Sequence, residues 1–125
     1  MVQRVYVDSS PKGEVRWFNE TTGQIGRHRV GKGRSVHEAE LFALTKALED
    51  VLPKMGNDDK LELYCDREVV VKQLNHQAGI RDKSVLRMTD KIWNLAYKVK
   101  EESKIEVKFL WVSRKKNPAG KMLGV

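Results

Sequence analysis

Alternating apolar and polar positions predict short strands in the opening part of the chain. The segments 2–8, 14–19 and 24–30 alternate in this way and are rich in β-branched and aromatic side chains. Residues typical of turns separate them at 9–13 and 20–23. This pattern predicts three antiparallel strands that follow one another as a meander.

A helical period begins where the alternation stops. Ser35 is followed three residues later by Glu38, the spacing of a capping box, which predicts that a helix starts here. Because proline ends or kinks a helix, we expect this helix to run to about Leu52, just before Pro53.

The second half of the chain predicts strands joined by helices. We expect a strand at 60–65, a short helix at 67–77, a long helix from 85 to about 102 capped by Ser84, and a strand at 105–112. The order βββαβααβ is typical of an α/β fold with a five-stranded mixed sheet flanked by helices. One face of the last strand is expected to carry Ile105, Val107, Phe109 and Trp111.

Size and composition predict one domain that covers residues 1–125. The chain is 40% hydrophobic and 33% charged, which suits a compact domain of this length. Its longest apolar runs are far below the 18 or so residues that a bilayer requires, and no leader is expected, so we predict a cytoplasmic protein. The only cysteine, Cys65, cannot form an internal disulfide, and no CxxC spacing suggests a structural zinc site. Residues 113–125 are expected to be a loop with one or two helical turns.

The charge of the chain favours a polyanionic partner. Its formal net charge is +7 and its pI is about 9.6. The excess lies at the two ends, since residues 1–34 carry 7 basic and 3 acidic side chains and residues 98–125 carry 8 and 3. Nucleic acid is therefore the first candidate partner, although solubility alone could also account for the charge.

Three carboxylates stand at unusual positions. Glu40 falls within the apolar stripe of the helix after Ser35, and a buried carboxylate needs a cation, hydrogen bonds or a raised pKa. Asp8 and Asp66 each close a hydrophobic strand, where ligands of open α/β sheets bind. Each acid also has a structural alternative: Glu40 could reach solvent, Asp8 could start a turn, and Asp66 could cap the helix that begins at Arg67. If all three converge, the oxygen-rich set favours Mg²⁺ or Mn²⁺.

The blocks around these acids resemble a known family. VYVDSS, the helix S-x-H-E-A-E-L-x-A-L-x-K-A-L, LYCDREVVVKQL and FLWVSRKKNPAG are similar to the four signature blocks of type 1 ribonuclease H, in the same order. The resemblance implies a ribonuclease H-like fold with Asp8, Glu40 and Asp66 as catalytic metal ligands. It also implies two-metal-ion hydrolysis of the RNA strand of RNA/DNA hybrids, leaving 5′-phosphate and 3′-hydroxyl ends. No membrane association and no obligate protein partner are implied.

The last block departs from the family pattern. The family has Asn followed after two residues by Ala-Asp, whereas this chain reads Asn117-Pro118-Ala119-Gly120-Lys121. Gly120 therefore stands where a fourth acid is usual, Lys121 would repel a cation, and Asn117 could supply one neutral oxygen instead. Activity could then be weak, manganese-dependent or lost. The alternative function is a catalytically weak or inactive module that binds hybrid or other duplex nucleic acid.

The same resemblance implies contacts with the substrate. Ser35 and His37 take the place of side chains that face ribose 2′-hydroxyls in the minor groove. Basic side chains after the last strand suit phosphate contacts. The full set of expected substrate-binding residues is Ser9, Ser10, Ser35, His37, Arg67, Arg114, Lys115 and Lys116, with Gln73 as a further candidate beside Arg67.

The remaining histidines and the tryptophans are expected to be structural. His28 and His76 are taken as surface residues without a function. Trp17, Trp93 and Trp111 are expected to be core or half-buried sheet residues and not stacking platforms for bases.

Overall fold

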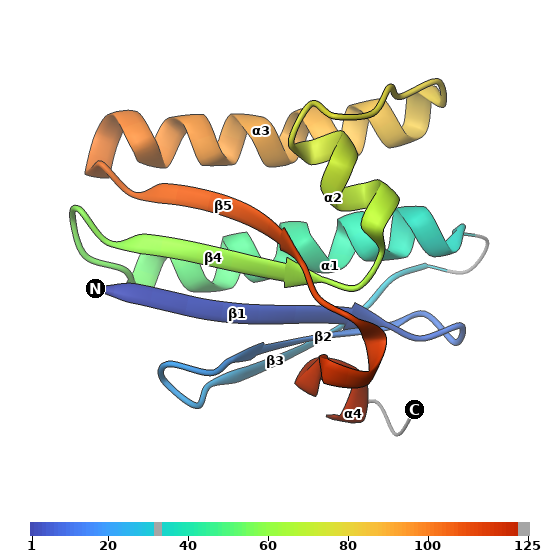
Figure 1. Cartoon of the computed structure of the whole chain (residues 1–125), viewed down its shortest axis with the longest axis horizontal. Helices are drawn as coiled ribbons and strands as arrows, with labels where there is room; N and C mark the ends of the chain where they lie inside the picture. The colour runs from blue at the N-terminus through green and yellow to red at the C-terminus, as the bar shows by residue number, and fades with distance from the viewer. Residues whose placement is uncertain (32–33, 123–125) are drawn as a thin grey trace.

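Five strands form one mixed sheet in the computed structural model, which describes residues 1–31 and 34–122. The strands lie in the order β3-β2-β1-β4-β5 (Figure 1). β1 pairs antiparallel with β2 and β2 with β3, whereas β4 lies parallel to β1 and β5 parallel to β4. The bounds are β1 Val2–Ser9, β2 Glu14–Asn19, β3 Ile25–Arg29, β4 Lys60–Cys65 and β5 Glu106–Trp111. The predicted α/β fold with an antiparallel meander followed by parallel strands is confirmed.

Four α-helices accompany the sheet. They are α1 Val36–Val51, α2 Glu68–Leu74, α3 Lys83–Ser103 and α4 Pro118–Met122, with the 3₁₀ turns η1 Leu52–Lys54 and η2 Arg114–Lys116. The helical turns predicted after residue 113 are thus present up to residue 122, and residues 123–125 lie outside the described part of the chain. No helix in the described residues is both long enough and apolar enough to cross a membrane.

The start of α1 follows the capping chemistry that the sequence indicated. The Ser35 hydroxyl oxygen accepts a hydrogen bond from the Glu38 backbone N–H at 3.1 Å, and the Glu38 carboxylate accepts one from the Ser35 N–H at 3.1 Å. Two unpaired donors at the helix end are satisfied in this way. The start of α1 is therefore held in one place, and with it the direction of every side chain in its first turns.

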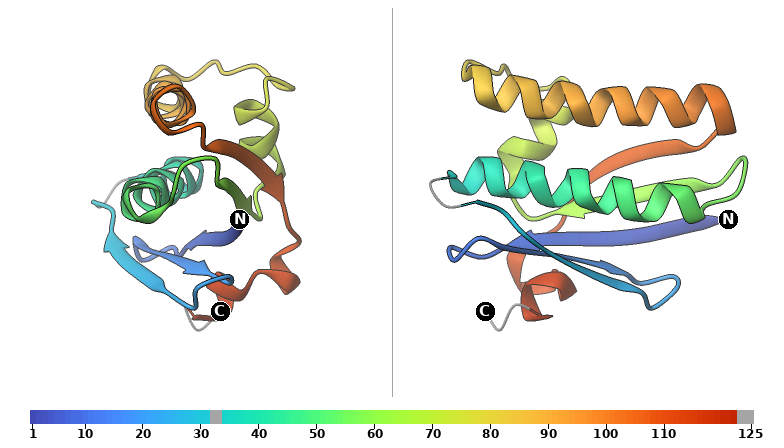
Figure 2. Two further views of the ribbon diagram at one scale, coloured as in Figure 1. Left: turned by 90° about the vertical axis from the view of Figure 1, so that its left-hand side faces the viewer. Right: turned by 180° about the vertical axis from the view of Figure 1, so that it is seen from behind.

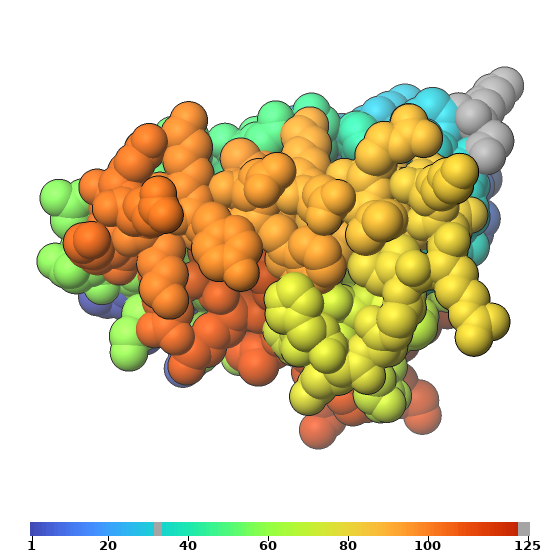
Figure 3. Space-filling model, turned by 90° about the horizontal axis from the view of Figure 1, so that it is seen from above, coloured from blue at the N-terminus to red at the C-terminus, as the bar shows by residue number. Residues whose placement is uncertain are grey.

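The two long helices cover one face of the sheet, as the end-on view in Figure 2 shows. α1 packs on strands β1 to β4, and α3 packs on α1 and β5. Figure 3 shows α3 running along the outside of this layer, with α2 beside it. The side chains that fill the core between sheet and helices include Val5, Val7, Leu41, Leu44, Leu48, Leu61, Leu63 and Ile92.

The opposite face of the sheet is covered in part by α4. This helix packs against β1 and β2. Along β1, Val5 and Val7 point to the helical layer, so Asp8 points to the other face, toward α4. The packing of α4 on β1 and β2 places this helix next to the carboxyl end of β1.

Two expectations about single residues are wrong. Asp82 caps α3, with its carboxylate accepting the Val85 N–H at 3.0 Å, whereas the Ser84 hydroxyl donates to Glu38 of α1 at 2.8 Å. Trp111 is 50% exposed, because β5 is an edge strand and its last residue extends past the helical layer. Trp17 is buried and Trp93 half-buried, as expected.

Candidate active site

Three carboxylates from separate parts of the chain meet at the carboxyl ends of β1 and β4. One oxygen from each of Asp8, Glu40 and Asp66 lies within 4.8 Å of the other two. β1 carries Asp8, α1 carries Glu40, and Asp66 follows β4 directly. The parallel pairing of β1 with β4 places two strand ends at one edge, and the capped start of α1 directs Glu40 to the same point.

The structural alternatives for these acids do not apply. Glu40 is only 2% exposed and so does not reach solvent. Asp8 lies inside β1, which continues to Ser9, and does not start the turn. The residue that caps α2 is Arg67, without a side-chain cap, so Asp66 is free to face the other carboxylates.

Hydrogen bonds hold the Glu40 carboxyl group in place. Its Oε1 accepts from the Ser9 N–H at 3.1 Å and from the Ser9 hydroxyl at 2.7 Å, and its Oε2 accepts from the Cys65 thiol at 3.3 Å. The pKa of Glu40 is raised to about 8, mainly by burial; the charges of Asp8 and Asp66 also raise it, whereas the hydrogen bonds from Ser9 and Cys65 lower it. No ion pair to any of the three acids exists among residues 1–31 and 34–122. The negative charge at this site therefore lacks a direct counter-ion from the described chain.

The Asp8 carboxyl group is also largely shielded from water. It is 4% exposed, and burial, followed by the charge of Asp66, raises the pKa of its carboxyl group. The Ser9 N–H, Glu40 and the positive charge of Arg114 oppose that rise. The Cys65 thiol has a pKa well above its usual range because it is buried, so it serves as a hydrogen-bond donor and not as a nucleophile.

Asn117 positions Asp66 and does not present an oxygen ligand. Its amide NH₂ donates to the Val7 carbonyl at 2.8 Å and to the Asp66 carboxylate at 3.3 Å, and its Oδ1 accepts the Ala119 N–H at 3.1 Å. A carbonyl can only accept a hydrogen bond, so the nitrogen must be the atom that faces Val7 and Asp66. The expectation that Asn117 supplies a metal-binding oxygen is therefore wrong.

Gly120 lies directly against Asp8. A Cβ at this position would stand 2.7 Å from the Asp8 Oδ2 atom, closer than carbon and oxygen can approach without a shift. Gly120, which the resemblance aligned with a fourth acid, thus lies beside Asp8 in space. A side chain at this position would therefore require the Asp8 carboxylate or the α4 backbone to shift.

A basic hollow adjoins the acids and gathers most of the predicted substrate contacts. Its volume is about 450 Å³. Five of the predicted residues line it, namely Ser9, Ser10, Ser35, Arg67 and Arg114, together with Lys12 and Arg34, which the sequence analysis did not single out. Lys12 and Arg34 lie in loops. The sequence does not show how close these loops come to the acids, because the fold determines that distance. Within residues 1–31 and 34–122, the lining has four basic side chains and no acidic one.

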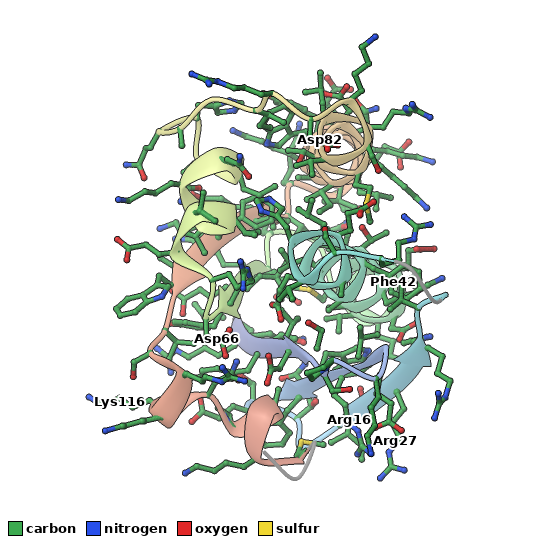
Figure 4. The ribbon with its side chains drawn as sticks, turned by 90° about the vertical axis from the view of Figure 1, so that its right-hand side faces the viewer. Arg16, Arg27, Phe42, Asp66, Asp82 and Lys116 are labelled. Carbon is green, nitrogen blue, oxygen red and sulfur yellow. The ribbon has the colours of Figure 1, made fainter. Side chains whose placement is uncertain are left out.

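The other predicted contacts lie elsewhere. His37 does not line the hollow: its Nε2 atom is buried without a hydrogen-bond partner among the described residues, and burial lowers the pKa of its imidazole. Gln73 donates to the Gly79 carbonyl at 3.0 Å. Lys115 lines a second, smaller hollow with Asp8, whereas Lys116 projects away from the body of the protein and from Asp66 (Figure 4).

Solved structures share this fold over nearly the whole chain. The RNase H1 of the halophilic archaeon Halobacterium salinarum NRC-1 superposes with a TM-score of 0.80 at 22% identity, covering 98% of this chain and 94% of its own. LC11-RNase H1, in a complex with an RNA/DNA hybrid, gives a TM-score of 0.80 at 20% identity, with 97% and 92% covered. The N-terminal RNase H domain of Rv2228c from Mycobacterium tuberculosis gives 0.74 at 15% identity, with 98% and 95% covered. At these identities, the likeness establishes the ribonuclease H-like fold.

Sequence comparison places the chain in a family. No curated protein matches the chain. A family model described as reverse transcriptase-like matches residues 16–123, which include Glu40, Asp66 and Gly120. From the matched length and the shared fold, this chain belongs to the reverse transcriptase-like family and has the fold of type 1 ribonuclease H.

Proposed function

We propose that this protein hydrolyses the RNA strand of RNA/DNA hybrids and requires a divalent cation to do so. The observation that carries the proposal is the convergence of Asp8, Glu40 and Asp66, two of them buried, without a basic side chain bound to any of them in the described residues. Keeping three acids this close is costly for stability, since burial and mutual repulsion raise the pKa of both Asp8 and Glu40. A bound cation removes that cost.

The donor set fits Mg²⁺ or Mn²⁺. Three carboxylates are hard oxygen ligands, and the only soft ligand nearby, the Cys65 thiol, is protonated and bonded to Glu40. When bound by these acids, the cation supplies an activated water and neutralises charge on the phosphoryl group. The expected products carry 5′-phosphate and 3′-hydroxyl ends.

The residues around the acids orient them and receive the substrate. Ser9 fixes the Glu40 carboxyl group, and Asn117 fixes Asp66. The arginine and lysine side chains of the 450 Å³ hollow suit backbone phosphates, and the Ser35 and Ser10 hydroxyls suit ribose 2′-hydroxyls, which distinguish RNA from DNA. The hybrid complex of LC11-RNase H1 supports the same class of substrate for this fold. A cytoplasmic location remains a prediction.

The direct test is cleavage of an end-labelled RNA/DNA hybrid, beside duplex RNA and duplex DNA, in Mg²⁺ and in Mn²⁺. We expect cuts only in the RNA strand of the hybrid. Asp8→Asn should abolish them. The matched control is Asp90→Asn on the exposed face of α3, which should leave the rate unchanged.

Absence of cleavage in both metals, with the hybrid still bound, would overturn the proposal. It would favour the second candidate, a catalytically silent module that binds hybrid or other duplex nucleic acid. Two observations favour that candidate: Gly120 stands where the family has an acid, and basic residues surround the acids. Cleavage of all three duplexes in wild type and Asp8→Asn alike would indicate a contaminating nuclease.

A further inference from the structure

The side of Asp8 that faces α4 is lined by different groups from the side that faces Glu40 and Asp66. Toward α4, Asp8 lies against Gly120, where an added Cβ would stand 2.7 Å from the Asp8 Oδ2 atom. The α4 backbone is buried at Ala119 and Gly120, so it cannot swing away without exposing apolar contacts on β1 and β2. The chain has no acid at this position, and any side chain there would require the Asp8 carboxylate to move.

Basic side chains occupy that side of Asp8 instead. A second hollow, of about 370 Å³, is lined by Asp8, Arg114, Lys115, Gly120 and Lys121. Its described lining has three cationic side chains and one carboxylate.

This lining suits an anion better than a cation. A hard divalent cation needs several oxygen ligands, and among the described residues that line the second hollow only Asp8 offers carboxylate oxygens. A phosphate group, in contrast, accepts hydrogen bonds from arginine and lysine. Arg114 lines both this hollow and the 450 Å³ hollow, so one arginine side chain borders both.

We propose that Asp8, Glu40 and Asp66 hold a single divalent cation, and that the hollow of Arg114, Lys115 and Lys121 binds a phosphate group of the substrate beside it. The substrate part of this inference rests on the proposed function. The basic side chains then supply, from the chain itself, the positive charge that a second ion supplies in a two-ion site. Lys121, which was expected only to repel a cation, becomes a substrate-binding residue.

The first test counts ions in the protein without substrate. Electron paramagnetic resonance of free Mn²⁺ measures how many ions are bound at saturation. We expect one per chain in the wild type and none at this site in Asp8→Asn. Two bound ions per wild-type chain, both lost in Asp8→Asn, would overturn the single-cation proposal.

The second test locates phosphate. In ¹H–¹⁵N spectra of the metal-free protein, inorganic phosphate should shift the amide signals of Gly120 and Lys121. We expect Lys121→Gln to weaken the apparent affinity about threefold, the size typical of one exposed charge pair. The matched control, Lys98→Gln on α3, removes the same charge far from the hollow and should change nothing. Unmoved Gly120 and Lys121 signals, or equal effects of the two variants, would overturn the phosphate site.

These tests separate the inference from the proposed function. If one Mn²⁺ and phosphate bind as expected but no hybrid is cut, the proposed hydrolysis is wrong and the ion and phosphate sites stand. If the hybrid is cut while two ions bind, the hydrolysis stands and the single-cation inference is wrong.

Discussion

Replacing Glu40 with glutamine should make the metal-free protein more stable, and by an amount that grows with pH. Burial raises the pKa of Glu40 to about 8 in the folded protein, whereas an unfolded chain has the ordinary value near 4.5. Between these values, the folded carboxyl group keeps a proton that the unfolded one has lost. The free energy of unfolding therefore falls as pH rises. Glutamine has no proton to lose, so Glu40→Gln removes this dependence.

The magnitude follows from the two pKa values. Each pH unit between them costs about 1.36 kcal/mol, so the advantage of Glu40→Gln should grow by about 3 kcal/mol from pH 5 to pH 7. For a domain of this length, that is roughly 10 °C in Tm.

Thermal unfolding with a chelator, at pH 5, 6, 7 and 8, measures the difference. Glu101→Gln, an exposed change on α3, is the matched control and should follow the wild type. Mg²⁺ at 1,000 times its Kd should reverse the order at pH 7, because it stabilises the wild type by about 4.1 kcal/mol and the variant much less. A constant difference between wild type and Glu40→Gln at all four pH values would refute the reasoning, since it would mean that Glu40 titrates normally.

Three further outcomes test the site. Mg²⁺ affinity should rise about tenfold per pH unit between pH 6 and 7, because Glu40 must give up its proton to bind the ion. Calorimetry in buffers of different ionisation enthalpy should detect the released proton. A flat profile of affinity against pH would contradict the raised pKa of Glu40. Asn117→Ala should lower the free energy of unfolding, measured by urea denaturation, by about 1–3 kcal/mol. It should also weaken Mg²⁺ binding, because Asp66 loses a hydrogen bond that holds it in place. Unchanged Mg²⁺ binding would show that Asn117 does not position Asp66. Gly120→Ala should cost about 1–3 kcal/mol because its Cβ meets Asp8, and a variant as stable as the wild type would show that α4 adjusts freely.

Local patterns in the sequence were sufficient to predict the order of strands and helices and to single out the three acids. The predicted strands at 14–19 and 60–65 have the bounds of β2 and β4, because strand alternation and turn residues act over a few positions. The capping box at Ser35 and Glu38 set the start of α1, and the helical period from that start directs Glu40 inward. These signals depend on neighbours in sequence, so they can be read without the fold.

Other features depend on contacts between distant segments, and only the folded chain determines them. Ser84 and Asp82 are both suitable caps for α3, and Asp82 takes the role while Ser84 bonds to Glu38, 46 positions away. Trp111 continues the alternation of β5, yet alternation defines a face of the sheet and not whether a helix covers that face. The direction of the Asn117 amide is likewise determined by the Val7 carbonyl, 110 positions earlier.

The two hollows could not be predicted from the sequence either, because distant segments form their walls. Arg114 joins them, but their walls come from the turn after β1, the start of α1 and the last turns of the chain. Four signature blocks in the sequence indicated which acids belong together. How closely α4 approaches Asp8, and hence what can bind beside it, is determined by the packing of α4 on β1 and β2, because a shift of less than 1 Å decides whether a Cβ fits there.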